Sequence, residues 1–106
     1  MPDITSRHNA LVARCRAVAR GDDRALVLLD GAHLVGEALE AGLRVQQVIA
    51  TSEAARRDDI EPLLTRAERA GAAVISVSQA VMVAISPVRT PTGLVALAVR
   101  PAYDGD

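Results

Sequence analysis

The sequence predicts one α/β domain, a three-layer α-β-α sandwich with a mixed sheet of about four strands. Segments with the hydrophobic spacing of helices and of strands alternate along the whole chain. Glycines stand where predicted helices end, and the connections are short. The 106 residues are 50% hydrophobic, which is enough for one aliphatic core. Alternating helices and strands of this kind form a sheet with helices on both faces.

The first helix is predicted from Ser6, its expected N-cap, to about Ala19. Apolar side chains recur at helical spacing along this segment, and the expected buried face consists of Leu11, Val12, Cys15, Val18 and Ala19. Residues 25–29 are a continuous apolar run, which is typical of a strand covered on both faces. Asp30 and Gly31 end this strand.

The middle of the chain predicts a helix, a strand and a second helix. The first helix covers about residues 33–41, is stopped by Gly42 and buries Leu34, Val35, Ala38 and Leu39. Residues 45–51 form the strand and residues 52–59 a loop. The next helix covers about residues 60–70, before Gly71, and packs through Leu63, Leu64 and Ala67.

The last third predicts a strand over residues 73–77 and a short helix, capped by Ser78, that ends near Ile85. Residues 86–93 form a loop because two prolines bar regular structure, and residues 94–99 form the last strand. We expect a domain over residues 1–101, with residues 102–106 as a linker or truncation point.

The composition excludes several classes of protein. Twelve Arg and no Lys against 13 acids give a net charge of −1, which rules out a polycation but permits a local basic patch. One Tyr and no Phe or Trp argue against modules that stack bases on aromatic rings. A lone Cys15 excludes an internal disulfide and fits a reducing cytoplasm. The sequence has neither a signal-peptide pattern nor an apolar stretch of membrane length, so we expect a cytoplasmic protein without a membrane partner.

Most catalytic and metal-binding templates are absent. There is no Gly-rich phosphate loop, no His-Glu-x-x-His and no Cys-x-x-Cys. His8, Cys15 and His33 are the only soft ligands, so we expect no metal site and no catalytic residue. Asp30 lies at the end of what we expect to be a central strand, three residues before His33. This pattern is either a simple turn or a ligand site at the carboxyl end of the sheet.

The first helix carries the strongest binding signal. Between Arg7 and Arg20 there are four Arg and no acid. The pattern is either a solvated helix face or a surface that contacts nucleic-acid phosphates. Arg89, in the loop over residues 86–93, is a possible second contact, although that loop is equally explained as a rigid connection.

Three segments in this order resemble one known domain. They are Ser6-Arg7-His8-Asn9, the run from Asp30-Gly31-Ala32-His33 to Leu39, and the run from Ser86-Pro87-Val88-Arg89 to Ala96. Together they resemble the N-terminal substrate-binding domain of the SpoU/TrmH family of RNA 2′-O-ribose methyltransferases. The resemblance covers nearly the whole chain.

The resemblance implies a fold like that of ribosomal proteins that bind kinked RNA, and a role in recognising structured RNA, expected to be ribosomal. Matching positions are Ser6, Asn9, Asp30, Gly31 and His33, although the family more often has Glu before the Gly. A basic residue often found soon after the Asn is here Ala13, with Arg14 beside it. The Arg that the family has before its first strand aligns only loosely, with Arg20 or Arg24.

The resemblance also implies what this chain does not do. In the family, catalysis belongs to a separate knotted domain that binds S-adenosylmethionine, and its motifs do not occur here. We therefore expect a parent methyltransferase that dimerises through that domain. This chain itself should bind no cofactor, catalyse no reaction and be monomeric. The alternatives are a stand-alone RNA-binding protein of ribosomal type and a protein-interaction module with an acidic partner.

The residues predicted to face RNA combine the Arg pattern with the motif positions. Arginines would contact phosphates, and the polar groups would adjust the register. The set is Arg7, Asn9, Arg14, Arg16, His33 and Arg89, with Ser6, Asp30 and Gly31 as a structural motif.

Overall fold

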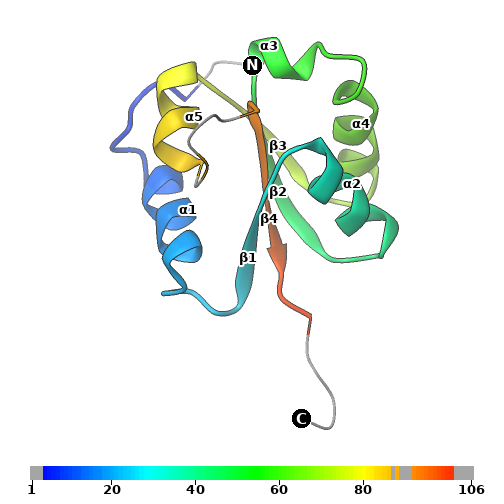
Figure 1. The fold of residues 1–106 in the computed structure, drawn as a ribbon, viewed down its shortest axis with the longest axis horizontal. Coiled ribbons are helices and arrows are strands. Elements are labelled where there is room, and N and C mark those ends of the chain that lie inside the picture. The colour runs from blue at the N-terminus through cyan, green and yellow to red at the C-terminus, as the bar shows by residue number, and fades with distance from the viewer. Residues whose placement is uncertain (1–3, 87, 89–91, 102–106) are drawn as a thin grey trace, which may run out of the picture.

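The computed structural model describes residues 4–86, 88 and 92–101, and within them the predicted sandwich is confirmed (Figure 1). One four-stranded sheet has the order β1-β4-β2-β3. The strands are β1 Leu26–Asp30, β2 Val45–Thr51, β3 Ala73–Val77 and β4 Leu94–Val99. The last three agree with the predicted bounds because a glycine, a proline or a helix cap brackets each apolar run.

The direction of the strands creates one edge where several loops meet. β4 is antiparallel to both β1 and β2, and β3 is parallel to β2, so β1, β2 and β3 run in the same direction. Their carboxyl ends, at Asp30, Thr51 and Val77, therefore lie at one edge, together with Gly93 just before β4. We call this the carboxyl edge. Ile4 reaches the same end of β3, where its N–H donates to the Ser76 carbonyl oxygen at 2.9 Å.

Helices cover both faces of the sheet (Figure 1). One face carries α1 Ala10–Arg20 and α5 Gln79–Ile85, and the other carries α2 Ala32–Glu40, α3 Ser52–Ala55 and α4 Glu61–Arg69. β4 alternates between the two cores: Val95 and Leu97 face the α1/α5 side, while Leu94, Ala96 and Ala98 face the other. The alanines concentrate on one side, because seven of the twelve buried residues on the α2/α4 side are Ala and none on the α1/α5 side is. The small side chains let α2 and α4 lie close to the sheet.

The N-cap predicted for the first helix is wrong. Asn9 caps α1, since its side-chain oxygen accepts a hydrogen bond from the Leu11 N–H at 2.9 Å. Ser6 closes the preceding turn, in which its carbonyl oxygen accepts from the Asn9 N–H at 3.1 Å. The chain must cross from Ile4, beside β3, to the start of α1. Residues 6–9, which the sequence pattern assigns to the first helix, form this connection instead.

Three other expectations require correction. β1 is an edge strand rather than a central one, because β4 returns between β1 and β2. The segment 52–59 is not entirely loop: Thr51 caps α3 by accepting from the Ala54 N–H at 3.1 Å. Leu34 is 44% exposed and Ala19 is also exposed, so neither is a core residue. The predicted stop at Gly42 and the predicted cap at Ser78 are confirmed.

Candidate nucleic-acid interface

The carboxyl edge gathers the starts of three helices. α2, α3 and α5 begin directly after the carboxyl ends of β1, β2 and β3, with Gly31, Thr51 and Ser78 as their N-caps. Backbone N–H groups at helix starts favour negative charge nearby. The three helix starts therefore favour an anionic ligand at this edge, while the Asp30 carboxylate at the end of β1 opposes it.

Asp30 ties two distant segments together at this edge. Its carboxylate accepts hydrogen bonds from the Ser86 hydroxyl and, at 3.4 Å, from the Thr92 hydroxyl. Beside it, the Gly31 N–H donates to the Leu94 carbonyl oxygen at 2.9 Å. The motif at residues 30–31 and the segment that follows α5 are thus in direct contact, although 56 residues separate Asp30 from Ser86.

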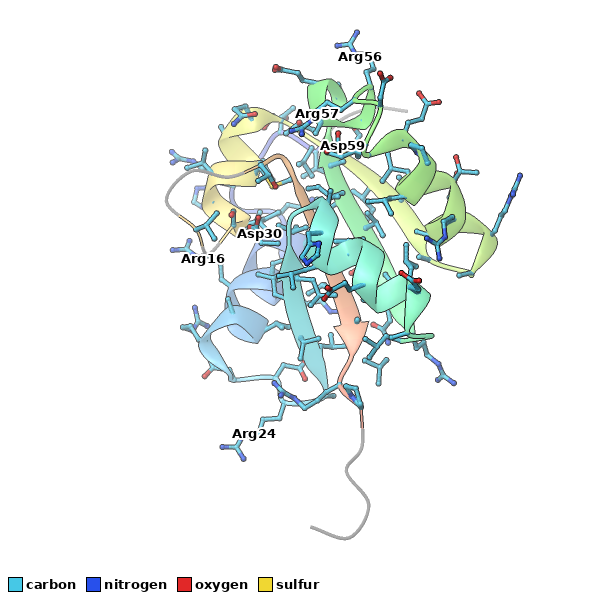
Figure 2. The ribbon with its side chains drawn as sticks, turned by 45° about the vertical axis from the view of Figure 1, so that its right-hand side comes forward. Arg16, Arg24, Asp30, Arg56, Arg57 and Asp59 are labelled. Carbon is cyan, nitrogen blue, oxygen red and sulfur yellow. The ribbon has the colours of Figure 1, made fainter. Side chains whose placement is uncertain are left out.

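A pocket of about 230 Å³ lies at the same edge. Its lining is mostly small and polar: Thr51, Glu53, Ala54, Arg57, Gln79, Thr92 and Gly93. Arg57 is held beside it by Asp59, through Nε–Oδ1 and Nη2–Oδ2 contacts of 3.1 and 2.9 Å, while Arg56 points outward (Figure 2). Neither arginine belongs to the set predicted from the sequence, although their position soon after a strand end is a usable signal.

Three of the predicted RNA-facing residues lie at the start of a helix or just before it: Arg7 and Asn9 precede α1, and His33 is in the first turn of α2. Arg7 is exposed between Ile4 and α1. Asn9 uses its side-chain oxygen as the helix cap, and its amide NH₂ points to donation as its role toward a phosphate ligand. His33 is 85% exposed in the first turn of α2, and its Nε2 lies 3.0 Å from an oxygen of Glu37.

Arg14 and Arg16 do not form one patch. Successive helical residues are rotated by about 100°, so these side chains point about 200° apart around α1. Arg14 donates to the side chains of Gln46 and Gln47 in β2, at 3.0 and 3.4 Å. Arg16 instead lines a cleft of about 370 Å³ between α1 and α5.

Two further arginines near the first helix, Arg20 and Arg24, do not contribute to the carboxyl edge. Arg20 also lines the α1/α5 cleft and pairs with Asp22 at 3.0 Å. Arg24 lies at the opposite end of the molecule (Figure 2). Arg89, the sixth residue of the predicted set, lies outside the described residues.

Charge is distributed unevenly between the two helical layers. Residues 4–21 and 78–86, which include α1 and α5, contain four Arg and no acid. Residues 32–41 and 52–70, on the other face, contain seven acids and four Arg. Within the described residues, none of the ion pairs involves Arg7, Arg14 or Arg16. The net charge of −1 therefore conceals a cationic α1/α5 face.

Other kinds of site receive no support from the described part of the chain. It contains no group of three His, Cys, Asp or Glu side chains that could hold a metal ion. No helix in it is long and apolar enough to cross a membrane. Cys15 is fully buried, and burial raises the pKa of its thiol to about 11 against a smaller opposing effect of Arg14. This thiol is therefore protonated and unreactive at neutral pH.

Solved structures similar to this chain include several RNA methyltransferases. An RNA 2′-O ribose methyltransferase is 28% identical with a TM-score of 0.80, over 99% of this chain and 40% of its own. An rRNA methyltransferase from Sinorhizobium meliloti is 20% identical with a TM-score of 0.78, over 96% of this chain and 38% of its own. The SpoU methyltransferase AviRb from Streptomyces viridochromogenes, in complex with AdoMet, is 19% identical with a TM-score of 0.70. It is matched over 92% of this chain and 35% of its own.

The chain spans 40% or less of each methyltransferase chain. The two structures at 19% and 20% identity establish the fold alone. No curated protein sequence matches the chain.

A family model gives the more specific result. The model of the MRM3-like substrate-binding domain matches residues 19–96, which run from the end of α1 into β4. The match includes Asp30, Gly31 and His33 and leaves out Arg7 and Arg14. The chain therefore belongs to the MRM3-like substrate-binding domain family.

Proposed function

We propose that this chain is the substrate-recognition domain of a SpoU-type 2′-O-ribose methyltransferase and that it binds structured ribosomal RNA. The observation that carries the proposal is the acid-free, arginine-bearing α1/α5 face next to the carboxyl edge, in a chain of this family. Arg7 and Arg16 on this face suit phosphate contacts, because a guanidinium group matches phosphate geometry with two donors.

The proposed binding mode uses backbone shape rather than base stacking. The sequence contains a single aromatic residue, so aromatic platforms for unstacked bases are excluded as the main contact. Arg7 and Arg16 would contact phosphates along the α1/α5 face, and His33 would contact the RNA at the start of α2. Arg14 keeps its positive charge while donating to neutral glutamines, so it would add long-range attraction.

We propose that the methyl donor is held by another part of the parent protein. Two of the similar structures contain AdoMet. The pocket at the carboxyl edge is small and polar, unlike the apolar cleft that an adenine ring requires. When bound, S-adenosylmethionine supplies the methyl group, and the residues of this chain would hold the RNA in position for it. We also propose that the domain is monomeric by itself and that the parent dimerises elsewhere.

A salt-dependent binding titration tests the proposal. Fluorescence anisotropy would follow labelled structured rRNA fragments at several salt concentrations, with heparin as a competing polyanion. Changing Arg7, Arg14 and Arg16 to Gln should weaken binding and reduce the slope of log K against log salt by about 1.4 to 1.8, because Arg7 and Arg16 each lose a phosphate contact that contributes about 0.7 to 0.9.

The matched control removes three arginines from the other side of the molecule. Arg44, Arg66 and Arg69 are exposed and equal in number and charge to the first set. Their change to Gln should have a clearly smaller effect on RNA affinity. Equal weakening by both triple variants, or competition by heparin as efficient as that by unlabelled rRNA, would contradict a specific RNA surface on the α1/α5 side.

A further inference from the structure

We propose that Asp30 is a positioning residue for RNA binding: its carboxylate fixes the two described ends of the segment 86–93 against the end of β1. This inference rests on the proposed function. Ser86 and Thr92 each donate a hydroxyl hydrogen bond to a different oxygen of the Asp30 carboxylate. One half-buried side chain therefore fixes two points of the chain that lie 56 and 62 residues away in sequence.

The two fixed points belong to different parts of the candidate RNA surface. Ser86 lines the α1/α5 cleft beside Arg16, and Thr92 lines the pocket beside Arg57. Figure 2 shows Asp30 on the same side of the molecule as Arg16. Asp30 therefore links the cationic cleft to the carboxyl-edge pocket through its two hydroxyl partners.

An acidic side chain beside an RNA-binding surface weakens RNA binding unless it has a structural role there. A carboxylate near RNA phosphates repels them, since like charges interact unfavourably even at the protein surface. Hydrogen bonds from hydroxyl groups to an ionised carboxylate are stronger than those between neutral groups, so they suit a residue that must hold two segments. Beside them, the Gly31 N–H and the Leu94 carbonyl oxygen join the same two segments through the backbone.

The charge also gives the experiment a discriminating sign. If Asp30 acted only through its charge, Asp30→Ala would remove a repulsive group and strengthen RNA binding. If Asp30 is a positioning residue, the same variant should bind structured rRNA about tenfold more weakly, which is the loss expected for one charge-assisted contact. Asp58→Ala is the matched control: it removes an exposed carboxylate from the segment that follows α3, so its RNA affinity should be unchanged or higher.

A double-mutant cycle tests whether Asp30 acts through its two partners. Ser86→Ala combined with Thr92→Val removes both hydroxyls and leaves the Asp30 charge in place. This pair should weaken RNA binding in the wild-type background and have no further effect in the Asp30→Ala background. Affinities are compared at a temperature where circular dichroism shows every variant fully folded, so lost stability alone does not move them.

An RNA-independent measurement separates failure of this inference from failure of the proposed function. Hydrogen exchange at the Gly31 amide, which is hydrogen-bonded to the Leu94 carbonyl oxygen, should accelerate in Asp30→Ala and remain unchanged in Asp58→Ala. If the wild-type protein does not bind rRNA, the proposed function fails. In that case, unchanged hydrogen exchange at the Gly31 amide in Asp30→Ala would also overturn the role of Asp30 in fixing the two segments. If the wild type binds rRNA, equal or tighter binding by Asp30→Ala, or additive effects in the cycle, would overturn the inference.

Discussion

Gly93→Ala tests the packing that sets the carboxyl edge. Gly93 has a φ of +92°, and an added Cβ would lie 2.9 Å from the Ala54 Cβ and 3.1 Å from the Thr51 hydroxyl oxygen. Both neighbours are buried, and the Thr51 oxygen is already engaged in capping α3. The methyl group therefore meets a rigid surface that cannot move without releasing the start of α3.

Two effects combine in this variant. A left-handed backbone conformation costs a residue with a Cβ about 1–2 kcal/mol, and overpacking of a tight site adds about 1–3 kcal/mol. We therefore expect Gly93→Ala to lower the free energy of unfolding by about 2–5 kcal/mol. Since single domains are typically stable by about 5–15 kcal/mol, the loss is a large part of the total.

Gly21→Ala is the matched control. Gly21 has a similar φ of +84°, but no atom lies within 4 Å of the position of an added Cβ. It should therefore lose only the backbone contribution of about 1–2 kcal/mol. Urea unfolding followed by circular dichroism measures both variants. If their losses in unfolding free energy agree within about 0.5 kcal/mol, the argument from close packing at Gly93 is refuted.

Two further predictions follow from the capping residue and the buried thiol. Asn9→Ala should cost about 1 kcal/mol of unfolding free energy because it removes the cap of α1, whereas Ser6→Ala should cost clearly less; equal losses would contradict the assignment of the cap. The pKa of Cys15 is raised from 9.0 to about 11 by burial, so the unfolded chain releases this proton first as the pH rises. Stability should therefore fall between about pH 9 and 11, and Cys15→Ala, compared by urea unfolding across this range, should lack that part of the loss.

Local sequence patterns predict the elements of this fold better than their arrangement. The strand at residues 45–51 is recognised from its own apolar run. The edge position of β1 depends instead on β4 pairing between β1 and β2, and no residue in the β1 run encodes that choice. β1 nevertheless has the apolar pattern of a covered strand, because helices lie over both of its faces.

Short elements and caps are ambiguous in sequence for a related reason. Ser6 and Asn9 are both good N-caps, and the position of Ile4 beside β3 decides between them. α3 has only four residues, so it shows no helical periodicity and depends on the hydroxyl of Thr51.

In the candidate site, too, local features can be predicted from the sequence, and contacts between distant segments cannot. The opposite directions of Arg14 and Arg16 follow from helical geometry, and their spacing in the sequence predicts them. The contacts of Asp30 with Ser86 and Thr92 join residues far apart in sequence and required the fold.

The central claim is that RNA contacts the α1/α5 face and the adjoining carboxyl edge. An NMR titration of the ¹⁵N-labelled protein with a structured rRNA fragment tests it most directly, because every backbone amide reports separately. We predict that shifts and line broadening concentrate on residues 4–21 and 78–86 and at Asp30 and Gly31. Perturbations concentrated instead on residues 34–41 and 61–69, the parts of α2 and α4 that lie beyond His33, would contradict this placement of the RNA.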